Sequence, residues 1–219
     1  MRRPRVKICC ISSVEEAKLA IEYGASALGL VGHMPSGPGV IEDKLIYQIV
    51  RMVPPPISTF LLTSETNSRD IISHYKRVQT STIQIVDELE NRDYELIRNE
   101  LPNVKLVQVI HVIDHNSVKE AIKISKYVDA ILLDSGNPNL SVKELGGTGR
   151  THNWELSREI RRSIPVPVFL AGGLNEDNVR KAIETVEPFG LDLCSSVRTG
   201  GKLDRQKLND FFKAIDKQS

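Results

Sequence analysis

The sequence predicts a (β/α)8 barrel in one domain over residues 1–219, and three observations support this fold class. Eight short β-rich segments alternate with eight amphipathic segments along the chain. The β-rich segments are mostly continuous apolar runs, as expected for parallel strands buried on both faces. Right-handed crossovers between parallel strands give a doubly wound sheet or a closed barrel, and eight units favour the barrel.

The predicted strands follow one another at short intervals. They are residues 5–11, 27–32, 57–63, 82–87, 105–112, 130–135, 166–173 and 190–196. No Gly-x-Gly-x-x-Gly run follows the first of them, which counts against a dinucleotide-binding sheet.

The predicted helices begin at recognisable capping residues. Ser13 with Glu16 three residues later forms a capping box, whereas the helix near Ile41 is the least clearly capped. The other expected N-caps are Asn67, Asn91, Asn116, Asn153, Asn175 and Asp204. Prolines at 54–56, 102 and 165 end helices.

Composition narrows the classes of partner. The net charge is +1, from 29 basic and 28 acidic residues, so nothing global favours nucleic acid and an anionic ligand needs local geometry. The N-terminus lacks the long apolar run of a signal peptide, and no segment could span a bilayer. Three cysteines do not make a disulfide framework. We therefore expect a cytoplasmic protein with no nucleic-acid or membrane partner.

In a barrel, the ends of the strands build the active site. Reading only these ends gives one set of candidates: Cys9, Cys10, His33, Thr63, Asp87, His111, Asp134, Gly172, Gly173, Ser195 and Ser196.

The last two strands indicate a phosphate site. Gly172 and Gly173 stand just before a predicted helix, and glycine lets the backbone approach a ligand closely. Ser195 and Ser196 begin a second small-residue loop that also holds Arg198. The glycines could simply make tight turns, but two adjacent loops of this kind favour phosphate binding.

A long segment follows the sixth predicted strand and contains Gly146 and Gly147. Long loops in compact domains are often functional, so these glycines are candidates for a lid over the ligand. A surface loop with a mobile turn is the competing interpretation.

Cys9 and Asp134 end two strands and could form a base and acid pair, if their surroundings separate their pKa values. A buried cysteine that only packs and an aspartate that only caps a loop are the alternatives. Strand alternation points Cys10 toward the helices, and Cys194 is expected to pack. A metal site from Cys9, His111 and Asp134 is rejected because these residues are too dispersed. His33, His74, His115 and His152 are expected to be solvated or loop residues.

Several runs together resemble the phosphoribosylanthranilate isomerase family: KICCI, AILLDS, GGTGRTHNW, FLAGGLNEDNV and LDLCSSVRTGGKLD. Their order and spacing match along nearly the whole chain. The resemblance implies an Amadori rearrangement of N-(5-phosphoribosyl)anthranilate to 1-(o-carboxyphenylamino)-1-deoxyribulose 5-phosphate, a step of tryptophan biosynthesis. It implies a phosphorylated sugar as substrate and no metal or organic cofactor.

The resemblance also implies roles for individual residues. Cys9 would remove the proton from C2 of the ribose, and Asp134 would protonate the ring oxygen. Asp192 would help position the amine. Backbone N–H groups around Gly172–Gly173 and Ser195–Ser196 would hold the phosphate. The acid must be protonated at rest, so we expect Asp134 to be buried beside an apolar wall.

Four departures from the family pattern leave the aglycone open. Cys10 stands where the family has glycine, residues 84–87 differ from its Gln-Leu-His-Gly, and Arg198 replaces an acidic residue. Residues 32–41 contain neither Arg nor Lys, although the family's loop carries an arginine for the anthranilate carboxylate. Losing such an arginine costs about 2–5 kcal/mol in a desolvated pocket. Either Arg198 or backbone N–H groups at 36–39 replace it, or the substrate is another phosphosugar.

Two other classes remain as alternatives. A lyase barrel would use a Schiff-base lysine, with Lys7 and Lys105 as candidates. A non-catalytic phosphosugar-binding barrel would need neither Cys9 nor Asp134. The sequence allows a monomer or a homodimer.

Overall fold

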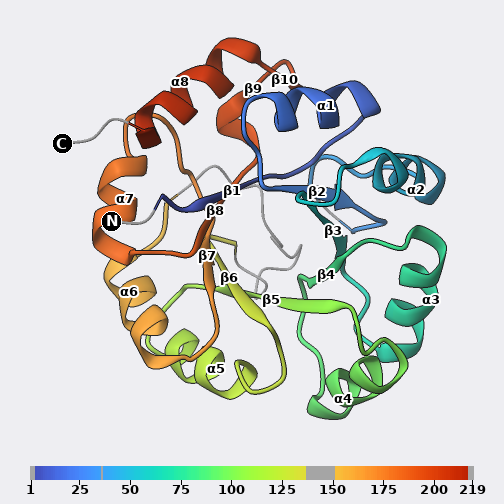
Figure 1. The fold of residues 1–219 in the computed structure, drawn as a ribbon. Coiled ribbons are helices and arrows are strands. Elements are labelled where there is room, and N and C mark those ends of the chain that lie inside the picture. Colours follow the sequence, from blue (N-terminus) through green and yellow to red (C-terminus); the bar gives the residue numbers. More distant parts are fainter. Residues whose placement is uncertain (1–2, 36, 137–150, 217–219) are drawn as a thin grey trace.

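Eight parallel strands close into a barrel, in which each strand pairs with the next and β8 pairs with β1 (Figure 1). The computed structural model describes residues 3–35, 37–136 and 151–216. The strands are β1 (Arg5–Ile8), β2 (Ala27–Val31), β3 (Ser58–Thr63), β4 (Thr82–Ile85), β5 (Lys105–His111), β6 (Ala130–Asp134), β7 (Val168–Leu170) and β8 (Gly190–Leu193).

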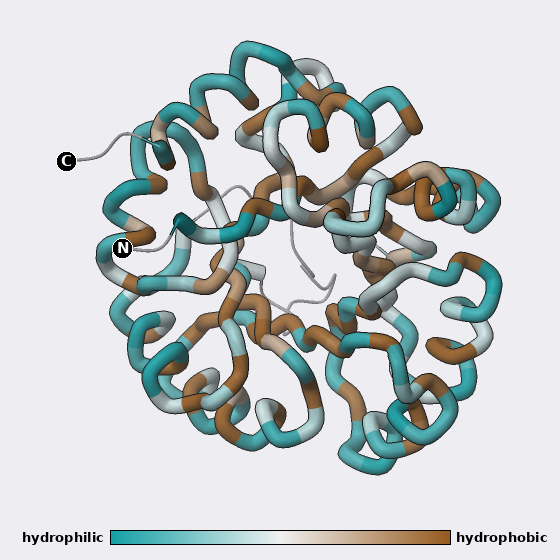
Figure 2. Tube along the Cα trace, viewed as in Figure 1, coloured by the Kyte–Doolittle hydropathy of each residue, from teal (hydrophilic) through white to brown (hydrophobic). Residues whose placement is uncertain are grey.

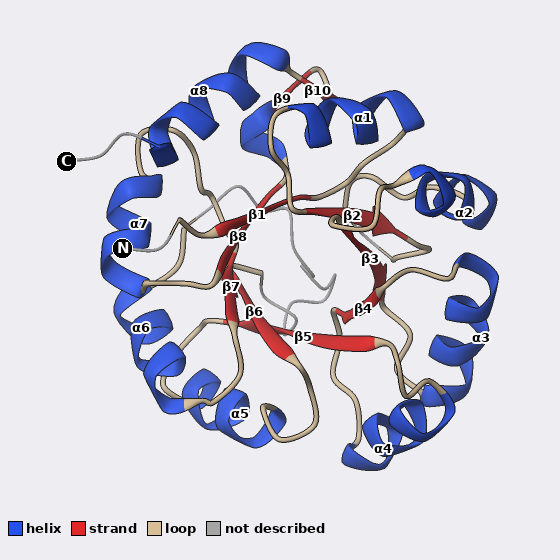
Figure 3. Cartoon of the chain, in the orientation of Figure 1, coloured by secondary structure: helices blue, strands red, loops and turns tan. Residues whose placement is uncertain are grey.

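Eight α-helices of the described chain surround this barrel, as the outer ring in Figure 3 shows. They are α1 (Val14–Glu22), α2 (Asp43–Met52), α3 (Ser68–Val78), α4 (Asn91–Glu100), α5 (Asn116–Ile124), α6 (Trp154–Ser163), α7 (Val179–Val186) and α8 (Arg205–Asp216). Between β8 and α8 lie the 3-10 helix η1 (Ser195–Val197) and a small antiparallel pair, β9 (Arg198–Thr199) and β10 (Lys202–Leu203).

Alternation along each strand divides the core in two. In β6, Ile131 and Leu133 belong to the large cluster that packs against the helices. Ala130 and Leu132 belong to a second cluster inside the barrel, where the Phe60 and Phe169 rings meet edge to face. Figure 2 shows apolar residues along the strands and on the helix turns that face them. Burial on both faces explains the continuous apolar runs of the sequence.

The strands occur where the sequence predicts them, but most are shorter at their C-terminal ends. β1 ends at Ile8 and β8 at Leu193, so Cys9, Cys10 and the Ser195–Ser196 pair lie beyond their strands. These residues therefore escape strand alternation, and their directions cannot be read from it.

The predicted caps are correct at some helices and displaced at others. Ser13, Asn67 and Asn153 are N-caps whose side chains accept backbone N–H groups of the first turn. Asn91 and Asn116 are instead first helical residues, and α7 is capped at Asn178 rather than Asn175. Among the described residues, no helix combines the length and hydropathy that crossing a membrane would need.

Candidate active site

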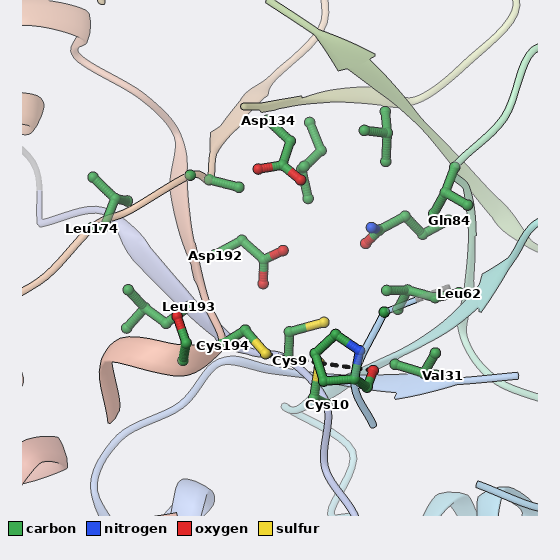
Figure 4. Close-up of a pocket in the computed structure, with 18 of the residues that line it drawn as sticks. Cys9, Cys10, Val31, Leu62, Gln84, Asp134, Leu174, Asp192, Leu193 and Cys194 are labelled. Atoms are coloured by element: carbon green, nitrogen blue, oxygen red, sulfur yellow. Dashed lines mark hydrogen bonds between the residues drawn. The ribbon is translucent and has the colours of Figure 1, made fainter. Parts of the chain in front are cut away.

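A cavity opens at the C-terminal ends of the strands, and Figure 4 shows the side chains that line it. Its lining comes from every strand end of the barrel or the segment just after it. The polar and small lining residues include Cys9, Cys10, Gln84, Asp134, Gly172, Gly173, Asp192, Cys194, Ser195 and Ser196. Much of the remaining wall is apolar, including Val31, Leu62, Val86, Val109 and Leu132.

Asp134 ends β6 and is 7% exposed. Burial raises the pKa of its carboxyl to about 6, and the charge of Asp192 adds to the rise. The backbone N–H of Ser135 donates to its Oδ1 at 2.8 Å and opposes the shift. The expectation that Asp134 is buried beside an apolar wall is therefore confirmed.

Lys7 and Asp192 form an ion pair inside the barrel, across the junction of β1 and β8. The Lys7 ammonium lies 2.8 Å from the Asp192 carboxylate, and neither side chain is exposed by more than 9%. Burial lowers the pKa of Lys7, but the charges of Asp192 and Cys9 outweigh it, so the net pKa is raised. A lysine held in its charged form is a poor Schiff-base nucleophile. Lys105, the other candidate, is exposed and pairs with Asp129.

Cys9 lies directly after β1 and is 6% exposed. Its backbone N–H donates to the Leu193 carbonyl at 2.7 Å, which fixes the residue beside β8. Gly29 of β2 makes room for the thiol, because a Cβ there would lie 2.7 Å from the Cys9 Sγ and 3.1 Å from the Lys7 Nζ. In Figure 4, Cys9, Asp192 and Asp134 extend toward one open space.

The predicted direction of Cys10 is wrong. Cys10 adopts a φ of 59°, the left-handed region, which turns its side chain toward the cavity rather than the helices. Its Sγ lies 2.8 Å from the Sγ of Cys194 and donates to the Pro38 carbonyl at 3.6 Å. Cys194 packs against the inner core cluster, as expected, and is also half-buried on the cavity wall.

Two backbone loops form the wall on the side of β7 and β8. Gly172 and Gly173 have φ values of 81° and 60°, which only glycine adopts easily. Asn178 donates from its amide to the Gly173 carbonyl at 2.9 Å and holds this turn. Within the described chain, no hydrogen bond uses the N–H of either glycine. Ser195 and Ser196 also line the cavity, and they lie in η1 rather than in a strand as predicted.

Arg198 does not reach the cavity, and its predicted role in binding a carboxylate is not supported. Its guanidinium pairs with Glu16 at 2.9 Å and donates to the carbonyls of Cys9 and Cys10 at 3.1 and 2.6 Å. The same Glu16 accepts the N–H groups of Ser12 and Leu203. Arg198 thus fastens the segment after β8 to the segment after β1.

Among the histidines, His33 and His115 are exposed and His152 lies in a loop, as expected, whereas His74 is neither solvated nor in a loop. His74 is buried on α3 and lies 2.9 Å from Asp43. His152 is partly buried, its Nε2 is 2.7 Å from the Ser157 hydroxyl, and burial lowers its pKa to about 4. In the part of the chain that the structure describes, no group of three His, Cys, Asp or Glu side chains could hold a metal ion.

Sequence reasoning missed Gln84, which lines the cavity, and Gly29, which makes room for the Cys9 thiol. Gln84 lies on β4, is 3% exposed and has a side-chain oxygen without a hydrogen-bond partner in the described residues. Gly29 was missed because a glycine inside a strand only signals close approach, without naming its neighbour. Gly146 and Gly147 lie outside the described residues.

Comparison with known proteins covers nearly the whole chain. A family model described as N-(5'phosphoribosyl)anthranilate (PRA) isomerase matches residues 6–214. N-(5'-phosphoribosyl)anthranilate isomerase 2 of Methanosarcina mazei is 33% identical, covering 95% of this chain and 96% of that protein. The isomerase of Nostoc punctiforme is 32% identical over 96% of this chain and 98% of its own length.

Solved structures of the same family are similar to this chain over nearly its whole length. The phosphoribosyl anthranilate isomerase of Thermotoga maritima superposes with a TM-score of 0.80 at 29% identity, covering 97% of this chain and 98% of that one. An isomerase in complex with reduced 1-(o-carboxyphenylamino)-1-deoxyribulose 5-phosphate gives 0.78 at 27% identity, with the same coverage. Since the family model spans almost all of the barrel, the chain belongs to the N-(5'-phosphoribosyl)anthranilate isomerase family.

Proposed function

We infer that the chain catalyses the Amadori rearrangement of N-(5'-phosphoribosyl)anthranilate to 1-(o-carboxyphenylamino)-1-deoxyribulose 5-phosphate, an aldose–ketose isomerisation of tryptophan biosynthesis. The observation that carries the inference is that a thiol, Cys9, and a buried carboxyl, Asp134, line one cavity in a chain of this family. Phosphosugar binding alone would require neither group.

We propose that Asp134 acts first, as the general acid. With a pKa of about 6, a usable fraction of the carboxyl carries a proton near neutrality. Donation of that proton to the ring oxygen breaks the C1–O bond, while the nitrogen lone pair forms a C1=N iminium. The acid is then the Asp134 carboxylate.

The second step is removal of the C2 proton, which we assign to the Cys9 thiolate. The C2–H electrons form a C1=C2 bond, and the iminium π electrons return to nitrogen, giving an enaminol. Transfer of a proton to C1 and loss of the C2 hydroxyl proton convert it to the ketone, so one proton is gained and one is released in this step. C1 is reduced and C2 oxidised within one molecule, so no external oxidant or cofactor enters the balance.

Asp192 is well placed to receive the substrate nitrogen. It lines the cavity; burial raises the pKa of its carboxyl, and the ion pair with Lys7 opposes this rise. A carboxylate near C1 would accept the amine N–H and stabilise the iminium charge by a charge-assisted contact. Gln84 offers a buried amide oxygen for a ribose hydroxyl.

We propose that the phosphate binds between the two backbone loops. Gly172 and Gly173 line this end of the cavity with positive φ values, and Ser195 and Ser196 add hydroxyls and amides. Backbone amides in the left-handed conformation form concave anion sites, so no lysine is required.

The anthranilate carboxylate needs a different partner from the family's arginine. No lysine or arginine belongs to the cavity lining formed by the described residues, and Arg198 is committed to Glu16. Gly37 lines the cavity, so we propose that backbone N–H groups of this loop bind the anthranilate carboxylate. A related barrel isomerase acting on another phosphosugar is the alternative that this feature favours.

The test is turnover of phosphoribosylanthranilate generated in situ, followed by loss of its fluorescence and identification of the ketose product. Cys9→Ala purified in parallel controls for contaminating host isomerase. We expect turnover by the wild-type protein alone. No turnover by folded protein that still binds ribose 5-phosphate would mean that the substrate has changed.

A substrate lacking the carboxylate, phosphoribosylaniline, separates the two interpretations. A clear preference for the anthranilate substrate is expected if the loop reads the carboxylate. Equal or better turnover of the aniline would favour the alternative.

We further propose a cytoplasmic location and a small phosphorylated sugar as the only required partner, the chain acting as a monomer or a homodimer. Sedimentation of the purified protein decides between the two oligomeric states.

A further inference from the structure

Two cysteines that the proposed reaction does not use meet at the cavity wall. Cys10 follows β1 and Cys194 follows β8, 184 positions apart, yet their Sγ atoms are separated by only 2.8 Å. Figure 4 shows both sulfurs beside Cys9 at one edge of the cavity. A disulfide bond is about 2.05 Å long, so a closure of about 0.8 Å would join them.

We propose that Cys10 and Cys194 are a modification site, which a hydroperoxide oxidises to a reversible disulfide that switches the enzyme off. The bond itself follows from the thiol geometry alone. Its effect on turnover rests on the function proposed above.

The surroundings of the two thiols differ, and this sets the order of events. Cys194 is half-buried and opens on the cavity, whereas Cys10 is 7% exposed. The hydrogen-bond contact between the two thiols lowers the pKa of Cys194, and the Arg198 guanidinium adds to this effect. The same contact raises the pKa of Cys10. Because the thiolate is the nucleophile, Cys194 reacts first.

The chemistry balances in two steps. The Cys194 thiolate attacks one peroxide oxygen, the O–O bond breaks, and a sulfenic acid forms with release of an alcohol, or of water when the oxidant is hydrogen peroxide. The Cys10 sulfur then attacks the sulfenic sulfur, its proton joins the departing hydroxide, and water leaves. The two thiols lose two electrons, and the peroxide bond accepts them.

The disulfide would act on both halves of the active site. Cys10 is adjacent to the proposed base Cys9, and Cys194 is adjacent to Ser195 of the proposed phosphate loop. Cys10 also contacts the loop after β2, since a Cβ at Gly39 would lie 2.5 Å from the Cys10 Cβ. Displacing reacting groups by about 1 Å can lower a rate about a hundredfold. We therefore expect at least a tenfold loss of kcat/KM on oxidation.

The experiment oxidises the reduced protein with hydrogen peroxide and maps the bond by mass spectrometry of a non-reduced tryptic digest. The expected product joins peptide 8–18 to peptide 182–198 and is lighter by two hydrogen atoms. Turnover should fall and return with dithiothreitol. Because Cys9 and Cys10 share peptide 8–18, the Cys9→Ser variant identifies the partner, and it should form the same bond.

Cys10→Gly is the matched resistant variant, since glycine suits the φ of 59° and should fold at least as well. Its ratio of oxidised to reduced turnover should stay near one. Loss of the bond in Cys9→Ser, or sulfinic acid on Cys194 without a bond, would overturn the site. A complete bond with turnover unchanged within twofold would overturn the switch.

A separate readout keeps the switch testable if phosphoribosylanthranilate is not the substrate. Ribose 5-phosphate binding, measured by calorimetry, should weaken at least tenfold in the oxidised wild-type protein and recover on reduction. Unchanged affinity would contradict closure of the cavity, whichever phosphosugar the enzyme converts.

Discussion

At the scale of single residues, Asp134 shows how a catalytic requirement lowers stability. The proposed acid must keep a proton near neutral pH, and burial achieves this by making the carboxylate form unfavourable. The same burial means that ionising Asp134 destabilises the folded state. Groups arranged for function commonly carry such a cost.

This gives a prediction for Asp134→Asn. The folded pKa of about 6 lies above the ordinary value of 3.8, so the stabilisation is complete below about pH 4 and lost as pH rises through 6. The shift corresponds to about 3 kcal/mol. The variant should therefore gain up to about 3 kcal/mol over wild type between pH 4 and pH 8. Urea unfolding of both proteins at pH 4 and pH 8 measures this gain. An equal difference in free energy of unfolding at the two pH values would contradict the prediction.

A candidate site residue could be predicted from the sequence where the end of a strand alone determines its position. Asp134 ends β6 and Cys9 follows β1, and the apolar runs of both strands are plain in the sequence. Cys10 could not be predicted in this way, because its direction depends on a backbone φ of 59° rather than on strand alternation. Arg198 could not be either, since its partner Glu16 is 182 positions away and no local pattern connects them.

At the scale of elements, β2 makes room for the Cys9 side chain because Gly29 has no side chain of its own. Gly29 is the point where the strand backbone passes the Cys9 side chain, and a Cβ there would also approach the Cys9 Cα at 3.0 Å. The clash involves backbone, so it cannot be relieved by moving one flexible side chain.

We predict that Gly29→Ala displaces Cys9 and lowers kcat by about a hundredfold. The cost in stability should be about 1–3 kcal/mol, as for other overpacked sites. Gly190→Ala is the matched control, because its Cβ would press on the Phe169 ring at the start of β8, away from Cys9. It should lose stability with kcat nearly unchanged, and equal losses of kcat in both variants would argue against a specific effect on Cys9.

Element positions were predictable from apolar runs and prolines, whereas exact ends were not. The extra residues assigned to β1 (9–11) are apolar and still buried, so composition does not mark where ladder pairing stops there, and those assigned to β7 and β8 range from buried to exposed. An asparagine near the start of a helix likewise does not fix the N-cap, because Asn91 and Asn116 are the first residues of α4 and α5 rather than their caps.

At the scale of the whole molecule, closure of the barrel joins the first strand to the last. β1 and β8 pair over four residues, and the Lys7–Asp192 ion pair spans this junction in the barrel interior. Lys7 could be found in the sequence only as a possible nucleophile, since its partner is supplied by closure itself.

We predict that Lys7→Met destabilises the protein by about 3–5 kcal/mol, because it leaves Asp192 buried without its counter-charge. The double variant Lys7→Met/Asp192→Leu should recover most of this loss. Breaking the exposed Arg3–Asp216 pair with Asp216→Asn should cost under about 1 kcal/mol. Urea unfolding of the four proteins decides, and a double variant less stable than Lys7→Met would refute a desolvation cost.

We propose that Cys9 and Asp134 act together as base and acid. The most direct measurement is kcat/KM for phosphoribosylanthranilate in Cys9→Ser, Asp134→Asn and the double variant, with folding checked by circular dichroism. We predict that each single substitution lowers kcat/KM by about 10²–10⁴. The double variant should have a kcat/KM no lower than that of the less active single variant, as expected for groups that serve one reaction. If Asp134→Asn kept kcat/KM within tenfold of wild type, Asp134 would not be the general acid.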